Sequence, residues 1–331
     1  MKTRLTKALG ITCPVIQAPM AFAAGGALAS AVSRAGGLGM IGGAYGDARW
    51  IDQQFDIAAG VRVGCGLITW KLAERPHLLD RVLARDPAAL FLSFGNPAPF
   101  APAIKEAGVP LICQVQTLRD ARQALDCGAD IIVAQGADAG GHGEARGTFA
   151  LVPEIADEIA RQNTPALLCA AGGIMDGRGL AAALMLGADG AVIGTRFWAS
   201  NEALVHPRIL KRAMAATGDD TIRTRVVDVV RGYDWPDRYN GRVLRNSFIQ
   251  KWHGSEDALK LEAGVVAAKW AAAQEAGDID VATAFAGEGI GLIRSVAAAG
   301  DILADLMAEA QRCLAGAATA IGGQIECAAP A

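Results

Sequence analysis

Two glycine-rich turns in the middle of the chain have the composition of a phosphate-binding site. Ala171-Gly172-Gly173 and Gly194-Thr195 each follow a run of apolar residues that indicates a buried strand. Glycines let backbone N–H groups approach a phosphate closely, and a helix N-terminus adds positive potential. A single glycine pair would more simply serve a tight turn. Two such turns after successive predicted strands, one of them followed by a hydroxyl, favour phosphate.

His142 is the candidate acid or base. It ends the segment Gln135-Gly-Ala-Asp-Ala-Gly-Gly-His142, which predicts a glycine-rich loop after another strand. An imidazole with an unperturbed pKa, about 6.5, is partly neutral at pH 7 and can accept a proton. A lone histidine more often has a structural role. Its place in a loop at the end of a predicted strand favours proton transfer instead.

The elements predicted around these segments form a barrel. Along the first 200 residues, Ala-rich helical stretches that end in glycine alternate with short β-branched runs, which is typical of a parallel sheet covered by helices. Eight such runs favour an α/β fold, a (β/α)8 TIM barrel, over the alternative of an open, doubly wound sheet. Active sites of such barrels lie at the carboxyl ends of the strands, where the candidate segments fall. The predicted strands are Val15–Met20, Leu38–Gly42, Arg62–Thr69, Ala89–Phe94, Leu111–Gln116, Ile131–Gln135, Ala166–Ala171 and Ala191–Phe197.

The pattern changes after Trp198. Residues 200–300 contain more charged and aromatic residues and predict a mostly helical elaboration over the barrel mouth, with an irregular loop at 231–238 and a helix at 256–276. Apolar residues then recur at helical spacing between Ile302 and Leu314, so 301–315 is predicted to be the closing helix of the barrel. We therefore expect residues 1–331 to form a single cofactor-binding domain, in which 1–199 supply the eight β/α units.

The composition argues against several other classes of protein. With a net charge of −3, the chain has no basic surface for nucleic acid. Its seven cysteines contain no C-x-x-C pair, which indicates reduced thiols in a cytoplasmic protein, and no metal site is expected. The uncharged stretch 8–33 is interrupted by Pro14, Pro19 and Gly25-Gly26, so it predicts a strand and a helix rather than a targeting or membrane segment.

Four motifs resemble those of the nitronate monooxygenases, formerly called 2-nitropropane dioxygenases. They are Pro14-Val-Ile-Gln-Ala-Pro-Met20, Gln135-Gly-Ala-Asp-Ala-Gly-Gly-His142, Ala170-Ala-Gly-Gly-Ile174 and Ile193-Gly-Thr-Arg-Phe197. The likeness covers nearly the whole chain. It implies an FMN-dependent barrel enzyme that oxidises alkyl nitronates or nitroalkanes with O₂ to a carbonyl compound and nitrite. The implied partners are a small-molecule substrate and O₂.

The resemblance also implies roles for individual residues. His142 matches the family's catalytic histidine, which removes the proton alpha to a nitro group. The main chain at 18–20 would support the flavin ring, Gln114 and Gln135 would hydrogen-bond it, and the two glycine turns would hold the phosphate. The expected cofactor-binding residues are Ala18, Pro19, Met20, Gly66, Gln114, Gln135, Gly140, Gly141, Ala171, Gly172, Gly173, Gly194 and Thr195.

Two positions depart from the family pattern. Gly66 stands where many members have an asparagine beside the flavin, and Gly143 follows the histidine where some members have an arginine. Two alternatives remain open. One is an NAD(P)H-dependent FMN reductase acting on a quinone or an enoyl-thioester. The other is a flavin-binding module without catalytic activity.

Overall fold

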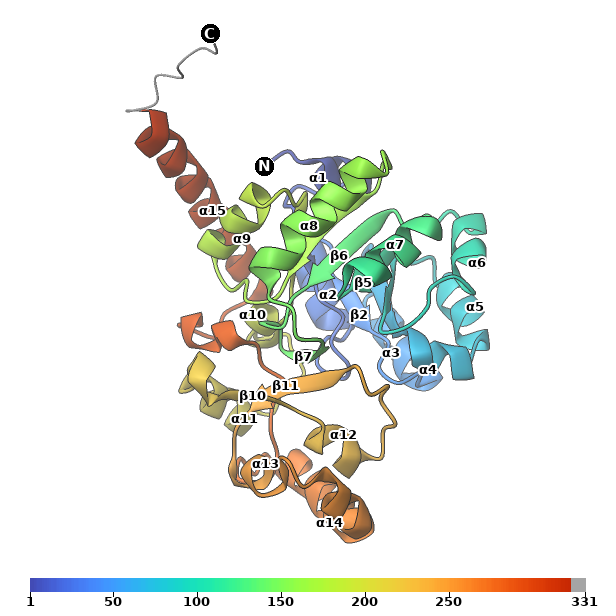
Figure 1. The fold of residues 1–331 in the computed structure, drawn as a ribbon, viewed down its shortest axis with the longest axis vertical. Coiled ribbons are helices and arrows are strands. Elements are labelled where there is room, and N and C mark those ends of the chain that lie inside the picture. Colours follow the sequence, from blue (N-terminus) through green and yellow to red (C-terminus); the bar gives the residue numbers. More distant parts are fainter. Residues whose placement is uncertain (323–331) are drawn as a thin grey trace.

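The computed structural model describes residues 1–322, in which eight strands form a parallel barrel (Figure 1). The strands lie in the order β1-β9-β8-β6-β5-β4-β3-β2, and a parallel bridge between Ile16 and Leu38 joins the two ends of this order. The predicted TIM barrel is confirmed, because this bridge closes the sheet. The barrel strands are β1 Val15–Gln17, β2 Met40–Gly42, β3 Gly64–Ile68, β4 Leu90–Ser93, β5 Leu111–Val115, β6 Ile131–Gln135, β8 Leu167–Ala171 and β9 Gly190–Ile193.

Side chains of the barrel strands alternate between two buried clusters. In β4, Leu90 and Leu92 pack with residues of the surrounding helices, whereas Phe91 packs in the barrel interior with Val133 of β6. Since successive side chains of a strand point to opposite faces, both faces of each strand are buried. This double burial explains why the strands are almost continuous apolar runs in the sequence.

Two predicted strand ends are wrong. The first strand was expected to reach Met20 but ends at Gln17, because Pro19 has no N–H to donate to a neighbouring strand. The last was expected to reach Phe197 but ends at Ile193. Its continuation, Thr195–Trp198, is the short helix α10. Both corrections move residues of the candidate site from strands into turns.

Helices surround the barrel as the alternating pattern predicts. α15 packs against α9 and α2, so it is the closing helix, although it extends beyond the predicted 301–315. Its apolar face, from Ile302 to Ala310, is buried against the barrel cluster. The helices of this layer are α1 Arg4–Leu9, α2 Gly26–Arg34, α3 Ala48–Ile57, α4 Thr69–Glu74, α5 His77–Leu83, α6 Ala101–Glu106, α7 Leu118–Asp126, α8 Thr148–Arg161, α9 Gly177–Met185 and α15 Ala299–Gly322.

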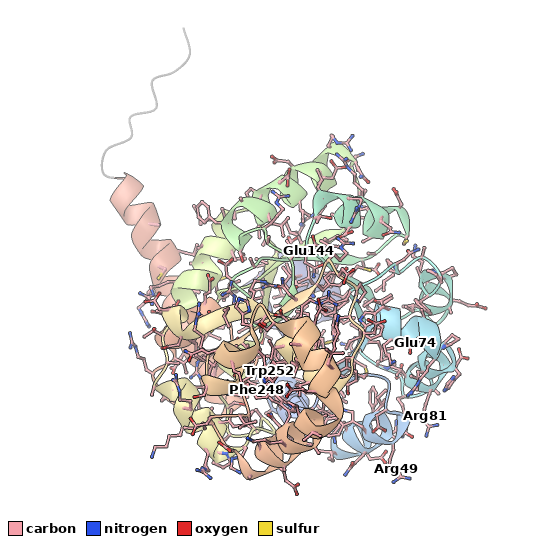
Figure 2. The ribbon with its side chains drawn as sticks, turned by 60° about the horizontal axis from the view of Figure 1, so that its bottom comes forward. Arg49, Glu74, Arg81, Glu144, Phe248 and Trp252 are labelled. Atoms are coloured by element: carbon pink, nitrogen blue, oxygen red, sulfur yellow. The ribbon has the colours of Figure 1, made fainter. Side chains whose placement is uncertain are left out.

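Residues 200–300 form a cap at one end of the barrel, the lower end in Figure 1. Figure 2, with that end turned forward, shows the helices of the cap in front of the barrel. The cap has its own cluster of buried residues, and Met20 packs against both this cluster and the barrel cluster. The cap elements are α11 Pro207–Met214, η1 Gly218–Asp220, β10 Thr221–Thr224, α12 Val226–Arg231, β11 Asn240–Leu244, α13 Ser247–Trp252, α14 Glu256–Ala276 and η2 Glu288–Leu292.

A three-stranded antiparallel sheet connects the cap to the barrel. It has the order β10-β11-β7, and its third strand, β7 Gly141–Gly143, belongs to the segment that follows β6. The predicted loop around His142 is therefore wrong at this point, since His142 lies in β7 opposite Gly241 of β11. The small sheet fixes the position of a side chain that was expected to be on a flexible loop.

Cys65, Cys113 and Cys169 are buried free thiols of the barrel strands, and burial raises the pKa of Cys65 to about 12. Cys327 lies outside the described residues, as do the last nine residues of the predicted domain, 323–331. None of the helices within residues 1–322 has both the length and the apolar character needed to cross a bilayer.

Candidate active site

A cavity of about 900 Å³ lies between the carboxyl ends of the barrel strands and the cap. Its barrel wall contains every residue predicted from the sequence for cofactor binding, and His142 lines the cavity from the small sheet that joins the barrel to the cap. Its cap wall consists of residues for which the sequence predicted no role. The cap residues of this wall include Leu204, Val205, His206, Ile209, Val227, Arg231, Trp235, Trp270, Gln274, Thr283, Ala284 and Phe285.

The two glycine turns provide unpaired main-chain donors at one part of the cavity. Within residues 1–322, the N–H groups of Gly172, Gly173, Gly194 and Thr195 make no hydrogen bond. Gly172 and Gly173 have φ values of 111° and 73°, which favour glycine. Unpaired N–H groups in a cavity favour binding of an anion, because a buried donor without a partner is costly. The turns therefore fit the phosphate of FMN.

Helix N-termini contribute less to this phosphate site than the sequence suggested. The first turn of α9 is already capped by the carboxylate of Asp176, which accepts from the N–H of Gly179 at 3.1 Å. Thr195 begins α10, and its hydroxyl accepts from the N–H of Gly287 in the cap at 3.1 Å. The loop N–H groups, rather than a long helix, would hold the phosphate.

The main chain after β1 forms a platform beside the glycine of β3. Ala18 donates its N–H to the carbonyl of Ile193 at 2.9 Å, which holds the platform to the last barrel strand. A Cβ atom on Gly66 would lie 2.3 Å from the ring of Pro19. Since a proline ring cannot move aside, the structure explains why a side chain at position 66 is absent from this chain.

Three glutamines form a hydrogen-bonded group centred on the side chain of Gln135. The side-chain carbonyl of Gln135 accepts from the amide of Gln114 at 3.0 Å and from that of Gln116 at 2.8 Å. The amide nitrogen of Gln135 makes no hydrogen bond within residues 1–322, so it can donate to a ligand. Gln114 and Gln135 both line the cavity, where they can bind the polar edge of a flavin.

His142 is held by three neighbours from the cap. Its Nε2 lies 2.8 Å from Oδ1 of Asp228, and its ring stacks on that of Trp235 with centroids 3.5 Å apart and planes 5° apart. Phe285 packs at an angle to the same ring. Burial lowers the pKa of His142 below its usual value, although the carboxylate of Asp228 opposes this effect. A neutral imidazole in a cavity can act as a base.

An aromatic cluster surrounds the stacked pair. Phe94 and Tyr239 contact Trp235 edge to face, and Tyr45 stacks on Tyr233 with centroids 3.7 Å apart. The guanidinium of Arg231 lies over both tyrosine rings. Burial raises the pKa of Tyr45 to about 12, so this phenol stays neutral. The surroundings of His142 are thus apolar, which favours an uncharged ring.

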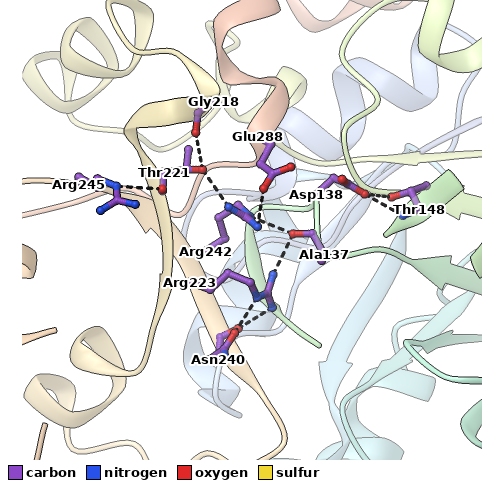
Figure 3. Close-up of polar contacts among 10 residues, drawn as sticks. All are labelled: Ala137, Asp138, Thr148, Gly218, Thr221, Arg223, Asn240, Arg242, Arg245 and Glu288. Carbon is purple, nitrogen blue, oxygen red and sulfur yellow. Dashed lines mark hydrogen bonds and ion pairs between the residues drawn. The ribbon is translucent and has the colours of Figure 1, made fainter. Parts of the chain in front are cut away.

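Two arginines anchor the segment that leads to His142 (Figure 3). Arg223 and Arg242 both donate to the carbonyl of Ala137, at 3.1 and 2.9 Å, and Arg242 pairs with Glu288 at 2.7 Å. Asp138 next to this carbonyl accepts from the N–H of Thr148 at 2.8 Å. Burial lowers the pKa of Arg223 to about 10, a value that still leaves it charged at pH 7.

Sequence reasoning missed the cap residues that contact His142. Asp228 stands inside the apolar run Val226-Val-Asp-Val-Val230, and a lone carboxylate in such a run was the available signal. Trp235 lies in the predicted irregular loop at 231–238 and gave no signal of its own. His206, which caps α11 and lines the cavity, gave no signal beyond the proline that follows it.

Comparisons with known proteins identify the family of this chain. A model of the nitronate monooxygenase family matches residues 2–64 and 67–309. A nitronate monooxygenase of Neurospora crassa is 32% identical, over 90% of this chain and 89% of that protein. A Mycobacterium tuberculosis protein, (3aS,4S,5R,7aS)-5-hydroxy-7a-methyl-1-oxo-octahydro-1H-indene-4-carboxyl-CoA dehydrogenase, is 34% identical, over 76% of this chain and 68% of that protein.

The fold agrees as well. The structure of FabK from Thermotoga maritima superposes with a TM-score of 0.84 at 29% identity, over 96% of this chain and 99% of that one. The gap inside the family match, residues 65 and 66, includes Gly66. The chain belongs to the nitronate monooxygenase family, and it is an oxidoreductase.

Proposed function

We propose that the protein is an FMN-dependent enzyme that oxidises alkyl nitronates, and the nitroalkanes from which they derive, with O₂ to a carbonyl compound and nitrite. The observation that carries this proposal is the buried ring of His142, whose pKa is lowered by burial, in a cavity that also presents N–H groups unpaired within residues 1–322. Membership of the nitronate monooxygenase family supports the same reaction.

The barrel wall of the cavity would hold the cofactor. The N–H groups of 172–173 and 194–195 would bind its phosphate, and the platform at 18–20 would support its ring. When bound, FMN supplies the redox chemistry, taking electrons from the substrate and delivering them to O₂. The absence of a side chain at Gly66 lets Pro19 of this platform pack directly against β3.

His142 would move the proton. A neutral nitroalkane must lose the proton alpha to its nitro group before it can be oxidised, and a base must lie within hydrogen-bond reach of that proton. The apolar rings around His142 keep it uncharged, and the small sheet fixes it at the cavity. A preformed nitronate has already lost this proton, so it would need His142 only for positioning.

Anaerobic reduction of the purified protein tests the proposal. FMN, without FAD, should be released on denaturation, and the flavin absorbance should bleach with a nitronate but not with NADH or NADPH. Bleaching by a pyridine nucleotide would instead identify a reductase. A flavin that none of the three bleaches would indicate a binding module without catalytic activity.

The cap wall favours one second candidate, an FMN reductase of enoyl-thioesters. The cavity of about 900 Å³ includes the part assigned to FMN, and Leu204, Val205, Ile209 and Trp270 give its cap side an apolar lining. A larger apolar substrate would fit there. The Mycobacterium tuberculosis relative bears the name of a dehydrogenase of a CoA ester, which supports the same possibility. Bleaching by NADH or NADPH, followed by reoxidation with an enoyl-CoA, would identify this activity.

We also infer a cytoplasmic location and no nucleic-acid partner. The free thiols of the barrel strands support a reducing compartment, and the net charge of −3 supports the absence of nucleic acid. Fractionation of the native host with an antibody against the protein would test the location.

A further inference from the structure

We propose that Asp228 is a positioning residue that keeps the hydrogen of His142 on Nε2 and so makes Nδ1 the nitrogen that takes a proton from the substrate. This inference rests on the proposed function of His142 as a base. Neither the family match nor the sequence motifs point to Asp228, and the two residues are 86 positions apart in the chain.

The hydrogen bond between the two side chains decides which nitrogen is basic. An ionised carboxylate can only accept, so the Nε2 atom that lies 2.8 Å from Asp228 Oδ1 must carry a hydrogen. A neutral imidazole has one N–H and one lone pair. If Nε2 holds the hydrogen, the lone pair is on Nδ1.

The Nδ1 atom is free to meet a substrate. It makes no hydrogen bond within residues 1–322. It also retains some solvent exposure, unlike the fully buried, unpartnered Oδ2 of Asp228. His142 lines the cavity, although only 7% of its side chain is exposed. The exposed part of the ring therefore includes the nitrogen that carries the lone pair.

The ring cannot easily turn to exchange its two nitrogens. Trp235 lies flat against one face, and Phe94 and Phe285 contact it from other directions. Gly241, opposite His142 in the small sheet, leaves room for this packing, since a Cβ there would lie 2.7 Å from the Phe285 ring. The cap thus fixes the plane of the ring, and Asp228 fixes its orientation within that plane.

Among the described residues, the side chain of Asp228 has no other hydrogen-bond partner that explains its burial. Its side chain is 2% exposed, and its Oδ2 atom is sealed from solvent without a hydrogen bond. A buried, half-satisfied carboxylate costs stability, so its presence calls for an explanation in function. The charged groups that act on His142 are Asp228 and, from the cap, Arg231 and Arg223, and only the carboxylate raises the pKa of the ring.

A direct test reads the hydrogen on the ring and needs no activity. In the FMN-loaded protein with ¹⁵N-labelled histidine, two-bond proton–nitrogen correlation spectra show which nitrogen is protonated, and comparison with His142→Gln identifies the signals. At a pH where the ring is neutral we expect the Nε2–H form. A ring protonated on Nδ1 would overturn the assignment whether or not nitroalkanes are substrates.

Asp228→Asn tests the consequence for catalysis. The amide can offer Nε2 either its oxygen or its NH₂ group, so the ring would divide between the two forms and lose the nearby charge. We expect kcat/KM for a neutral nitroalkane to fall about 10–100-fold, less than on removal of the ring, with little change for the preformed nitronate. The pH profile should move to lower pH, because the group that raises the pKa is gone.

Asp189→Asn is the matched control. Asp189 is also a buried carboxylate, but it binds Arg4 at 2.7 Å at the opposite end of the barrel. This variant should leave both the ring form and the pH profile unchanged. If Asp228→Asn left them unchanged too, the positioning role of Asp228 would be disproved. Equal losses on nitroalkane and nitronate in Asp228→Asn would also overturn it, since they would indicate only a structural effect.

Discussion

The barrel wall and the cap wall of the cavity are built in different ways. The barrel contributes main chain and small residues, such as Gly172, Gly173 and the platform at 18–20. The N–H groups of its glycine turns have no partner within residues 1–322. The cap contributes rings and charges, among them Arg231 and Trp235. A wall with few side chains suits a flat cofactor common to a family, whereas a wall of side chains suits the selection of a substrate. We therefore expect substitutions in the two walls to separate cofactor binding from proton transfer.

The largest effect should come from His142→Ala. A general base contributes about 10²–10⁴-fold, so kcat/KM for a neutral nitroalkane should fall by a factor in that range while FMN stays bound. Activity on the preformed nitronate should fall much less. Steady-state kinetics on both substrates with the one variant provide the measurement. Equal losses on the two, with weakened flavin binding, would mean that the histidine only braces the small sheet.

Gly173→Val should affect the barrel wall alone. Its φ of 73° strains any other residue, and the new side chain would lie in the turn expected to bind phosphate. We expect FMN to bind about 10–100-fold more weakly, as measured by flavin fluorescence in titrations of the apoprotein. Gly108→Val is the control, because Gly108 has a similar φ of 69° with nothing within 4 Å. Equal losses of flavin in both variants would remove the argument for a phosphate site.

Arg242→Met should loosen the connection between the walls. It removes one of two donors to the Ala137 carbonyl and leaves Glu288 without its partner. Losing such contacts costs about 1–3 kcal/mol, so thermal unfolding should occur a few degrees lower. The affinity of the protein for flavin should change little, since the substitution leaves the glycine turns unchanged. An unchanged melting temperature would show that Arg223 alone holds the segment.

The smallest effect is the position of the pH profile. Because burial lowers the pKa of His142, kcat/KM for a neutral nitroalkane should rise through an apparent pKa below the usual 6.5 and then level off. The same shift favours the folded state above pH 6.5, and this contribution to stability is lost as the pH falls through the lowered pKa. Rates and unfolding measured across this range check both statements, and an apparent pKa above 6.5 would contradict them.

The difference between the walls also explains how much the sequence could predict. The cavity-lining residues of the barrel lie at or just after the carboxyl ends of its strands, so finding the strand of Gln135 or Ala171 locates the site residues as well. No such rule locates the cavity-lining residues of the cap, because they do not follow barrel strands. Asp228 meets His142 where β7 pairs with β11. β7 is the short segment Gly141–Gly143, and its composition gives no signal of this pairing. The strand expected up to Phe197 failed for a related reason, since apolar composition does not distinguish a strand end from a buried helical turn.

The seam of the barrel, where β1 meets β2 and the sheet closes, has a consequence for the order of folding. β1 and β2, three residues each, are joined by the bridge between Ile16 and Leu38 and by the N–H of Met40, which donates to Oε1 of Gln17 at 3.1 Å. The platform proposed to support the flavin follows directly after β1. α15 packs against α2 and α9, on the side where this seam lies, and it comes after all eight strands in the chain. On the ribosome, the strands would therefore emerge before the helix that secures their closure. Flavin loading should then be a late event, one that follows release of α15 and that can report on completion of the native fold.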